Sequence, residues 1–446
     1  MKKRIYRRMP VNDFQPQSIS PADLGGKLVF AIDVAKVDMV AAVAAADGRV
    51  LHTICWKAPE QNPAVLSILR GFRTAGVTVE AVMEPSGTYG DVLRHQLELD
   101  AFPVFMVSGK RTHDAKEIFD GVPSLHDAKA AAIIARLHAD GLSTRLRDEG
   151  PDRRQLRAAL AIMDLYQERY LQLVHRLESW LARHWPELHT LLELTSSSLK
   201  ALLARIGGPA DVAAAPEQAT KLLLGISHRL IADDKIAAVI ASASTSVGVP
   251  LVGLERNALM AIAEDAYRAH RAFTTAKTKV DQLAAATPAA TLAPVVGHTT
   301  AAAVFAEVGD ARSFPCTRAF LKAMGLNLKE KSSGTVQGQI KITKRGPSRV
   351  RQYLWLAVFR WIQDDPIANA WYQRKKQRDG GRASRAAVAL MRKLAKGLYH
   401  VGRGGSFDSS KLFDTRRLQV GDVARSFVGK GSKPSPLMLN AQISEG

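Results

Sequence analysis

The stretch KLVFAIDVAK, at residues 27–36, is the first part of the chain whose pattern indicates a fold. Its apolar run ends at Asp33, and MVAAVAAADGRVLHTICW follows at residues 39–56, with Asp47 and Gly48 between two further apolar runs. Short apolar segments on either side of an Asp-Gly pair are typical of a β-hairpin. The sequence therefore predicts three consecutive antiparallel strands.

Downstream of the hairpin, helical and strand patterns alternate. The predicted elements are a helix at about 63–74, a strand VTVEAVME at 77–84, a helix after Gly87, a strand PVFMV at 103–107 and an Ala-rich helix at 124–140 with Ser124 as its N-cap. Strands that alternate with helices predict a mixed sheet joined by crossover helices. We assign residues 27–145 to this α/β domain.

Two heptad patterns follow the first domain. Apolar or tolerated residues recur in steps of three and four from Leu156 to Leu181, and again from Leu259 to Leu283. This spacing predicts two long helices that pair either antiparallel within one chain or across subunits. We expect a helical coiled-coil spacer over 150–290, with short helices between the two long ones.

The remaining segments complete the predicted fold class, which is α/β plus α. Residues 291–402 read as a mainly helical, strongly basic C-terminal domain. Residues 1–26 are basic and then rich in Pro, Gln and Ser, and residues 403–446 are rich in Gly, Ser and Lys. Because such compositions bury little apolar surface, we expect a flexible N-terminus and a disordered tail.

The charge of the chain points to a polyanionic partner. Lysine and arginine number 62 against 42 acidic residues, which gives a formal net charge of +20 over 446 residues. Nucleic acid is the first expectation. No apolar run approaches the roughly 20 residues of a membrane-spanning helix, and no signal core follows the basic start, so we expect a cytoplasmic protein with no membrane partner. Cys55 and Cys316 lack metal-ligand spacing and are interpreted as buried or incidental thiols.

Three carboxylates occupy related places in the predicted first domain. Asp33 ends the first strand, Glu84 ends the fourth, and Asp127 lies on the helix after the sheet. They can converge at one edge of a ribonuclease-H-like sheet and hold two divalent metals, for which Mg²⁺ fits. Taken singly, each is more often a turn former or helix cap. Sugar kinases and actin-like ATPases share such a sheet, but GTYG at 87–90 is a poor phosphate loop.

A fourth acidic ligand is expected near Asp127. Ser124 stands one helical turn earlier, so the choice falls between Asp120, which we favour, and Asp114. The alternative is that both are solvated charges at a helix end.

A serine pair and many cations lie together in the C-terminal domain, within GLNLKEKSSGTVQGQIKITKRGPSRVRQYL at 325–354. Beside a hydroxyl nucleophile, cations can offset the charge that develops on a phosphate. The alternative is a surface loop with ordinary Ser-Gly turn chemistry. The candidate nucleic-acid contacts are Lys329, Lys331, Lys341, Lys344, Arg345, Arg349 and Arg351. Upstream, APVVGHTTAAAVFAEVGD resembles hairpins of helices that present backbone NH groups to phosphates.

These segments together resemble the transposases of the IS110 family of insertion sequences, whose first domain is similar to the junction resolvase RuvC. The similar segments are AIDVAK, VMEPSGTYG, LHDAKAAAIIARL, PVVGHTTAAAVFAEVGD, MGLNLKEKSSG and ITKRGPSRVRQYL, in the family's order over most of residues 28–400. The resemblance implies Asp33, Glu84 and Asp127 as metal ligands and Ser333 as the nucleophile. Ser124 departs from the family's aspartate pair, which leaves the fourth ligand open.

The resemblance also implies a tetrameric recombinase that acts on double-stranded DNA, in some members directed by a structured guide RNA from the element. We expect a homo-oligomer, either dimer or tetramer. Two other functions remain open at this point: a metal-dependent junction nuclease that uses water as its nucleophile, and a nucleic-acid-binding protein without catalytic activity.

Overall fold

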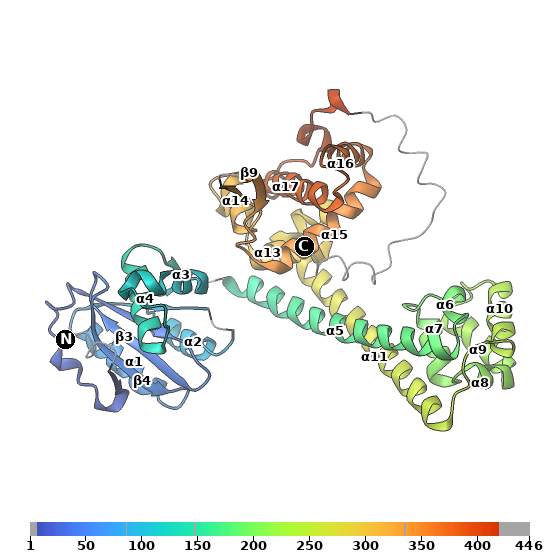
Figure 1. Ribbon diagram of the computed structural model, residues 1–446, viewed down its shortest axis with the longest axis horizontal. Helices are drawn as coiled ribbons and strands as arrows, with labels where there is room; N and C mark the ends of the chain where they lie inside the picture. Colours follow the sequence, from blue (N-terminus) through green and yellow to red (C-terminus); the bar gives the residue numbers. More distant parts are fainter. Residues whose placement is uncertain (1–6, 86, 147–148, 334–335, 419–446) are drawn as a thin grey trace. The chain divides into compact units, whose positions relative to one another are not determined.

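The computed structural model describes residues 7–85, 87–146, 149–333 and 336–418, without the side chains of 118–120, 331–337 and 339. The chain forms two compact units, Met1–Asp148 and Glu149–Gly446 (Figure 1). Each unit is described by itself. Within the described residues, no helix is long and apolar enough to cross a membrane.

A seven-stranded sheet forms the first unit. In sheet order, its strands are β1 (Arg8–Pro10), β4 (Val50–Lys57), β3 (Asp38–Ala44), β2 (Lys27–Asp33), β5 (Thr78–Met83), β6 (Val104–Met106) and β7 (Thr144–Arg145). Strands β2, β3 and β4 pair antiparallel, which confirms the predicted start, and β5 and β6 continue the sheet in parallel. This mixed sheet is compatible with a ribonuclease-H-like domain.

Helices cover both faces of this sheet. Helices α1 (Asn62–Thr74) and α2 (Asp91–Leu99) pack on one face, where Phe30 and Ile32 point, and α4 (Asp127–Ala139) packs on the other, where Val29 and Ala31 point. Helix α3 (Gly109–Asp120) lies beside α4. The small side chains of α4 let it approach the sheet closely, and most of them are fully buried.

The N-terminal segment is ordered from Arg7 onward, so the prediction of a flexible segment over 1–26 is wrong for its described part. Strand β1 pairs parallel with β4, and two single-turn 3₁₀ helices follow at Val11–Asp13 and Pro16–Ser18. The apolar side chains of the segment are widely spaced, yet they are buried in the same core as α1: Val11, Phe14, Ile19 and Leu24. Burial of these four groups offsets the cost of ordering the chain.

Two long helices form the frame of the second unit. Helices α5 (Gly150–His184) and α11 (Gly253–Ala285) pack against each other within one chain. Leu160 shares a core with Val280, whereas Leu181 shares one with Leu259, so the two helices run antiparallel (Figure 1). This is one of the two predicted arrangements.

Short helices connect the far ends of this hairpin, as predicted. They are α6 (Leu188–Leu191), α7 (Ser197–Arg205), α8 (Pro209–Ala214), α9 (Pro216–Ile226) and α10 (Asp233–Ser244). Trp185, at the end of α5, is fully buried among them.

The C-terminal part packs at the other end of the hairpin. Its elements are α12 (Ala293–Val296), α13 (His298–Glu307), α14 (Thr317–Ala323), β8 (Leu328–Ser333), β9 (Val336–Ile342), α15 (Ser348–Asp364), α16 (Pro366–Arg378) and α17 (Ala383–Gly402). Strands β8 and β9 form an antiparallel hairpin. The part is mainly helical, as expected.

The predicted disordered tail is wrong for residues 403–418. Two 3₁₀ turns occur at Ser409–Leu412 and Thr415–Arg417. The rings of Phe407 and Phe413 pack on Trp361 at centroid distances of 5.7 and 5.6 Å, so apolar contacts hold this stretch to the helical core. Residues 419–446 lie outside the described residues.

Candidate active site

The first unit brings the ends of two strands to one edge of the sheet. Asp33 is the last residue of β2, and Glu84 directly follows β5. The strands are parallel neighbours in which Ile32 pairs with Met83, so both carboxylates leave the sheet at the same level. Asp127 is the first residue of α4, which packs on β2.

The three acidic side chains interact electrostatically. The Asp33 carboxyl is partly buried, and burial raises its pKa to about 6, together with the negative charges of Asp127 and Glu84; Arg8 opposes the rise. Burial and like charges both disfavour an ionised carboxyl. The folded chain therefore holds Asp33 at a place where a cation would relieve a standing electrostatic cost.

A glycine makes room for Glu84. A Cβ atom added to Gly109, the first residue of α3, would lie 2.2 Å from Glu84 Oε1. Any larger side chain at this position would displace the carboxylate. Sequence reasoning did not single out Gly109, because nothing near it in the chain shows which side chain approaches it.

Asp127 has a cationic partner. The Arg8 Nη2 atom lies 3.0 Å from Asp127 Oδ2, and the two side chains are 42% and 50% exposed. Sequence reasoning missed Arg8, which falls in the segment predicted to be flexible. Its place follows from the parallel pairing of β1 with β4, a three-residue contact without a sequence signature.

A buried lysine holds the loop before Asp127 by hydrogen bonds to its backbone. Lys129 is 1% exposed, and its Nζ donates to the carbonyl oxygens of Val122 at 2.7 Å and Ser124 at 2.9 Å. The helix begins at Asp127, three residues later than predicted, because the ring of His126 accepts the Lys129 backbone NH as the N-cap. Ser124 is an exposed loop residue instead.

Asp114 and Asp120 are the two candidates for the fourth metal ligand. Asp114 is exposed and pairs with Lys110 at 3.1 Å, which lowers its pKa, so it is a solvated charge on the surface of α3. Asp120 is the last residue of α3, and its side chain lies outside the described residues. Asp120 stays a prediction.

The carboxylates fit a divalent metal by their chemistry. Magnesium needs only one or two protein carboxylates with water and phosphate oxygens, and burial first, then the charges of Asp127 and Glu84, raise the pKa of Asp33. As the described side chains stand, no three of the Asp, Glu, His and Cys residues are grouped closely enough to hold an ion. Arg8, rather than a third carboxylate, is the partner of Asp127.

In the second unit, Ser333 ends strand β8. The ladder pairs Ser333 with Val336 and is irregular between Lys331 and Ser333; the side chains of these three residues lie outside the described ones. The same ladder places Lys329 directly opposite Lys341, and both are exposed. Like charges directly opposite each other on paired strands are unfavourable, so this hairpin carries concentrated positive charge.

The turn after β9 is packed against the end of α14. A Cβ atom added to Gly346 would lie 2.5 Å from the Gly325 nitrogen, so only glycine allows this approach. Lys344 and Arg345 precede it as exposed residues, and the Lys344 backbone NH donates to the Gly325 carbonyl at 3.1 Å. The close packing fixes the backbone that carries the two cations.

Two of the predicted nucleic-acid contacts have structural partners. Arg349 pairs with Asp164 at 2.7 Å and with Glu307. Burial lowers the pKa of its guanidinium, but the two carboxylates outweigh that effect, so the pKa rises. Arg351 donates to the carbonyl oxygens of Gly346 and Pro347. Both arginines therefore hold the fold together. Lys329, Lys341, Lys344 and Arg345 remain the exposed cations of the set.

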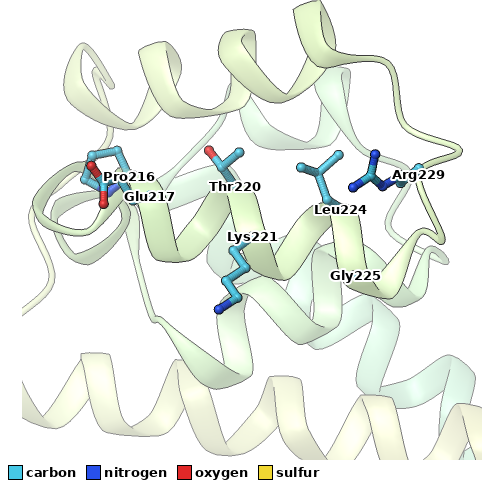
Figure 2. Close-up of a pocket in the computed structure, with 7 residues that line it drawn as sticks. All are labelled: Pro216, Glu217, Thr220, Lys221, Leu224, Gly225 and Arg229. Carbon is cyan, nitrogen blue, oxygen red and sulfur yellow. The ribbon is translucent and has the colours of Figure 1, made fainter.

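A cavity on the short helices offers no comparable chemistry. It has a volume of about 560 Å³ and is lined along one face of α9, from Pro216 to Gly225, with Arg229 beyond the helix end (Figure 2). Its charged residues are Glu217, Lys221 and Arg229. With a single carboxylate, it lacks a set of acidic residues comparable to Asp33 at the end of β2 and Glu84 directly after β5.

Comparisons with known proteins match both units. A transposase family model, for the DEDD domain of IS110 transposases, matches residues 30–186. A second, "Transposase IS116/IS110/IS902 family", matches residues 290–373. The "Insertion element IS110 uncharacterized 43.6 kDa protein" of Streptomyces coelicolor is 28% identical over 310 residues, which cover 64% of this chain and 72% of that protein.

The first match contains Asp33, Glu84 and Asp127, and the second contains the Ser333 hairpin and its cations. The fold, the acidic sheet edge and these matches define the class of the protein as a DNA transposase, an enzyme that binds DNA and recombines it. Within this class, the chain belongs to the IS110 family of insertion-element transposases. A DEDD domain implies a divalent metal.

Proposed function

We propose that this transposase cuts and rejoins double-stranded DNA with a magnesium site on Asp33, Glu84 and Asp127 and with Ser333 as its nucleophile. The observation that carries the proposal is the electrostatic coupling of the three carboxylates at the ends of β2 and β5 and the start of α4. Asp120 is our candidate for the fourth ligand. Mg²⁺ bound there would supply charge neutralisation and activation at the phosphate.

The residues of the chain have separate tasks in this scheme. Asp33 and Glu84 leave paired strands of the sheet at the same level, while Gly109 leaves space for the Glu84 carboxylate. Lys129 holds the loop before Asp127 from inside the domain. The backbone that carries these carboxylates is thus fixed before substrate binds, which limits the reorganisation needed during reaction to the side chains.

Ser333 supplies a covalent route that conserves the phosphodiester. Its Oγ attacks the phosphorus, one strand P–O bond breaks, and the leaving strand oxygen takes up a proton as the serine hydroxyl loses one. Return of the strand oxygen reverses these bonds and needs no external energy. Attack by water, as in a junction nuclease, would discard that energy. Joining is therefore the property that favours serine over water.

The cations of the second unit bind the DNA backbone in this proposal. Lys329 and Lys341 on the β8–β9 hairpin that carries Ser333, and Lys344 and Arg345 after this hairpin, present exposed positive charge. The turn at Gly297, between α12 and α13, can add backbone NH groups. We further propose a homo-oligomer, dimer or tetramer, and a structured guide RNA, for which the same phosphate chemistry serves.

The metal site is tested by isosteric variants. Asp33→Asn, Glu84→Gln and Asp127→Asn should each abolish strand cleavage and weaken Mn²⁺ binding measured by calorimetry, while circular dichroism stays unchanged. Asp114→Asn, an exposed acid on α3, is the matched control and should retain both. Full activity of the three variants in the presence of a chelator would exclude the metal mechanism.

The nucleophile is tested with a suicide substrate nicked near the exchange point. The wild-type chain should form a DNA adduct that survives denaturation and maps to Ser333 by mass spectrometry. Ser333→Ala should lose the adduct and rejoining but keep DNA binding, whereas Ser332→Ala should keep most of each. Adduct-free cleavage that persists in Ser333→Ala would make the water-dependent nuclease the correct function.

A further inference from the structure

One cation lies inside the acidic site, and it comes from the N-terminal segment. The Arg8 Nη2 atom lies 3.0 Å from Asp127 Oδ2. Its backbone is fixed by the pairing of β1 with β4, where Arg8 is opposite Thr53. The rest of the segment is anchored by buried Val11 and Phe14. The guanidinium is therefore held at the site by the fold.

The contact occupies an oxygen that a metal would need. A guanidinium and a divalent cation compete for the Asp127 carboxylate, and the ion is the stronger competitor, because an exposed ion pair contributes little free energy. The Arg8 side chain is 42% exposed and long enough to leave its partner without any change in the backbone of β1. Metal binding and the Arg8–Asp127 pair are thus alternatives at one carboxylate.

A displaced arginine next to a metal site has an obvious second partner. Guanidinium binds phosphate through paired NH donors, and it does so more specifically than lysine. DNA brought to the metal would place phosphate oxygens beside the same three carboxylates. The charge that balances Asp127 in the free chain is then available to balance the substrate.

We propose that Arg8 exchanges partners during the reaction cycle. It is the counter-ion of Asp127 while the site lacks metal, and it binds a DNA phosphate once metal has taken Asp127. This inference rests on the proposed metal site. It gives the N-terminal segment a function: β1 couples metal loading to substrate binding.

The first test measures metal affinity. Mn²⁺ binding by calorimetry is compared for Arg8→Gln and Arg7→Gln, which remove the same charge from adjacent residues; Arg7 is exposed and precedes β1. Loss of the competitor should make Arg8→Gln bind Mn²⁺ about two- to fivefold more tightly than Arg7→Gln, the range that an exposed ion pair provides. Equal affinities, or weaker binding by Arg8→Gln, would refute the competition.

The second test measures DNA affinity by fluorescence anisotropy with a duplex of arbitrary sequence at matched ionic strength. In EDTA the two variants should bind DNA within twofold of each other. In Arg7→Gln, Arg8 is then still paired with Asp127 and does not contact the DNA. In Mg²⁺, Arg8→Gln should bind roughly fivefold more weakly than Arg7→Gln, since a charge-assisted contact is missing. A deficit of equal size in both conditions would mean a permanent phosphate contact, and no deficit in either would refute the exchange.

A failure of the underlying metal site gives a different result. If Asp33→Asn leaves Mn²⁺ binding unchanged, the metal lies elsewhere and the proposed function fails before Arg8 is considered. If Asp33→Asn abolishes binding while Arg8→Gln and Arg7→Gln behave alike, the metal site stands and the role of Arg8 is wrong. Thermal melting in EDTA checks that both arginine variants fold.

Discussion

Replacing Asp33 with Asn should stabilise the metal-free protein while destroying its metal site. In the folded chain the pKa of Asp33 is raised from 3.8 to about 6, first by burial and then by Asp127 and Glu84. The folded state therefore disfavours the ionised form. Its stability falls as pH rises from about 4 to 6, and the whole cost is present above that range.

The size of this effect follows from the same values. A rise from 3.8 to about 6 corresponds to about 3 kcal/mol, and because the carboxyl is partly open to solvent we reduce this to about 1–2 kcal/mol. Asn has the same shape and no charge. In EDTA at pH 7.5, Asp33→Asn should raise the free energy of unfolding of the first unit by that amount, and the gain should fade as pH drops below 6.

Hydrogen exchange of the β2 and β5 amides in the full-length chain measures this free energy for the first unit alone. Saturating Mg²⁺ should stabilise the wild type and leave Asp33→Asn unchanged, because a ligand stabilises only the state that binds it. Asp114→Asn, which removes an exposed and paired charge, should not stabilise the unit. An Asp33→Asn protein no more stable than wild type in EDTA at pH 7.5 would show that the carboxylates do not repel as argued.

Three further predictions concern residues other than Asp33. Gly109→Ala should weaken Mn²⁺ binding at least tenfold with the helix content unchanged, because the added methyl would occupy the place of the Glu84 carboxylate; calorimetry that finds unchanged affinity contradicts the steric argument. The double variant Lys344→Gln with Arg345→Gln should flatten the dependence of DNA affinity on salt by nearly two in log–log slope, and an equal slope would remove both residues from the backbone contact. Arg349→Ala should leave that slope unchanged but destabilise the second unit by about 1–2 kcal/mol in urea, since Asp164 keeps only the Tyr353 hydroxyl and Glu307 only the longer pair with Arg157 at 3.6 Å.

The sequence predicted the elements of the first domain because their signals are local. The apolar runs around Asp47 and Gly48 specify a hairpin, and the alternation after it specifies a mixed sheet. The order of Asp33 and Glu84 along this pattern was enough to predict that both lie at one edge of the sheet, whereas their convergence with Asp127 on a metal stays a prediction. The carboxyl ends of neighbouring parallel strands lie at the same edge of a sheet, whatever sequence connects the two strands.

The missed features depend on contacts between distant residues. The pairing of Arg8 with Asp127 joins positions more than a hundred residues apart, and β1 is too short to have a periodic pattern. The buried anchors of residues 7–26 are diluted by Pro, Gln and Ser, so composition hid them. Arg349 looked like one more surface cation, because sequence cannot show that Asp164 lies beside it.

The antiparallel hairpin of α5 and α11 restricts how this chain can change in length during evolution. Thirty-five residues of α5 extend over about 52 Å at 1.5 Å per residue, and each residue turns the helix by about 100°. Loss of a single residue in the middle of α5 would rotate Leu177 and Leu181 away from α11. The short helices that follow α5 would then lose their packing positions. Insertions and deletions among relatives should therefore accumulate in the short helices between Trp185 and Val252, where a loop can absorb them, and the hairpin should keep its length while its surface sequence drifts.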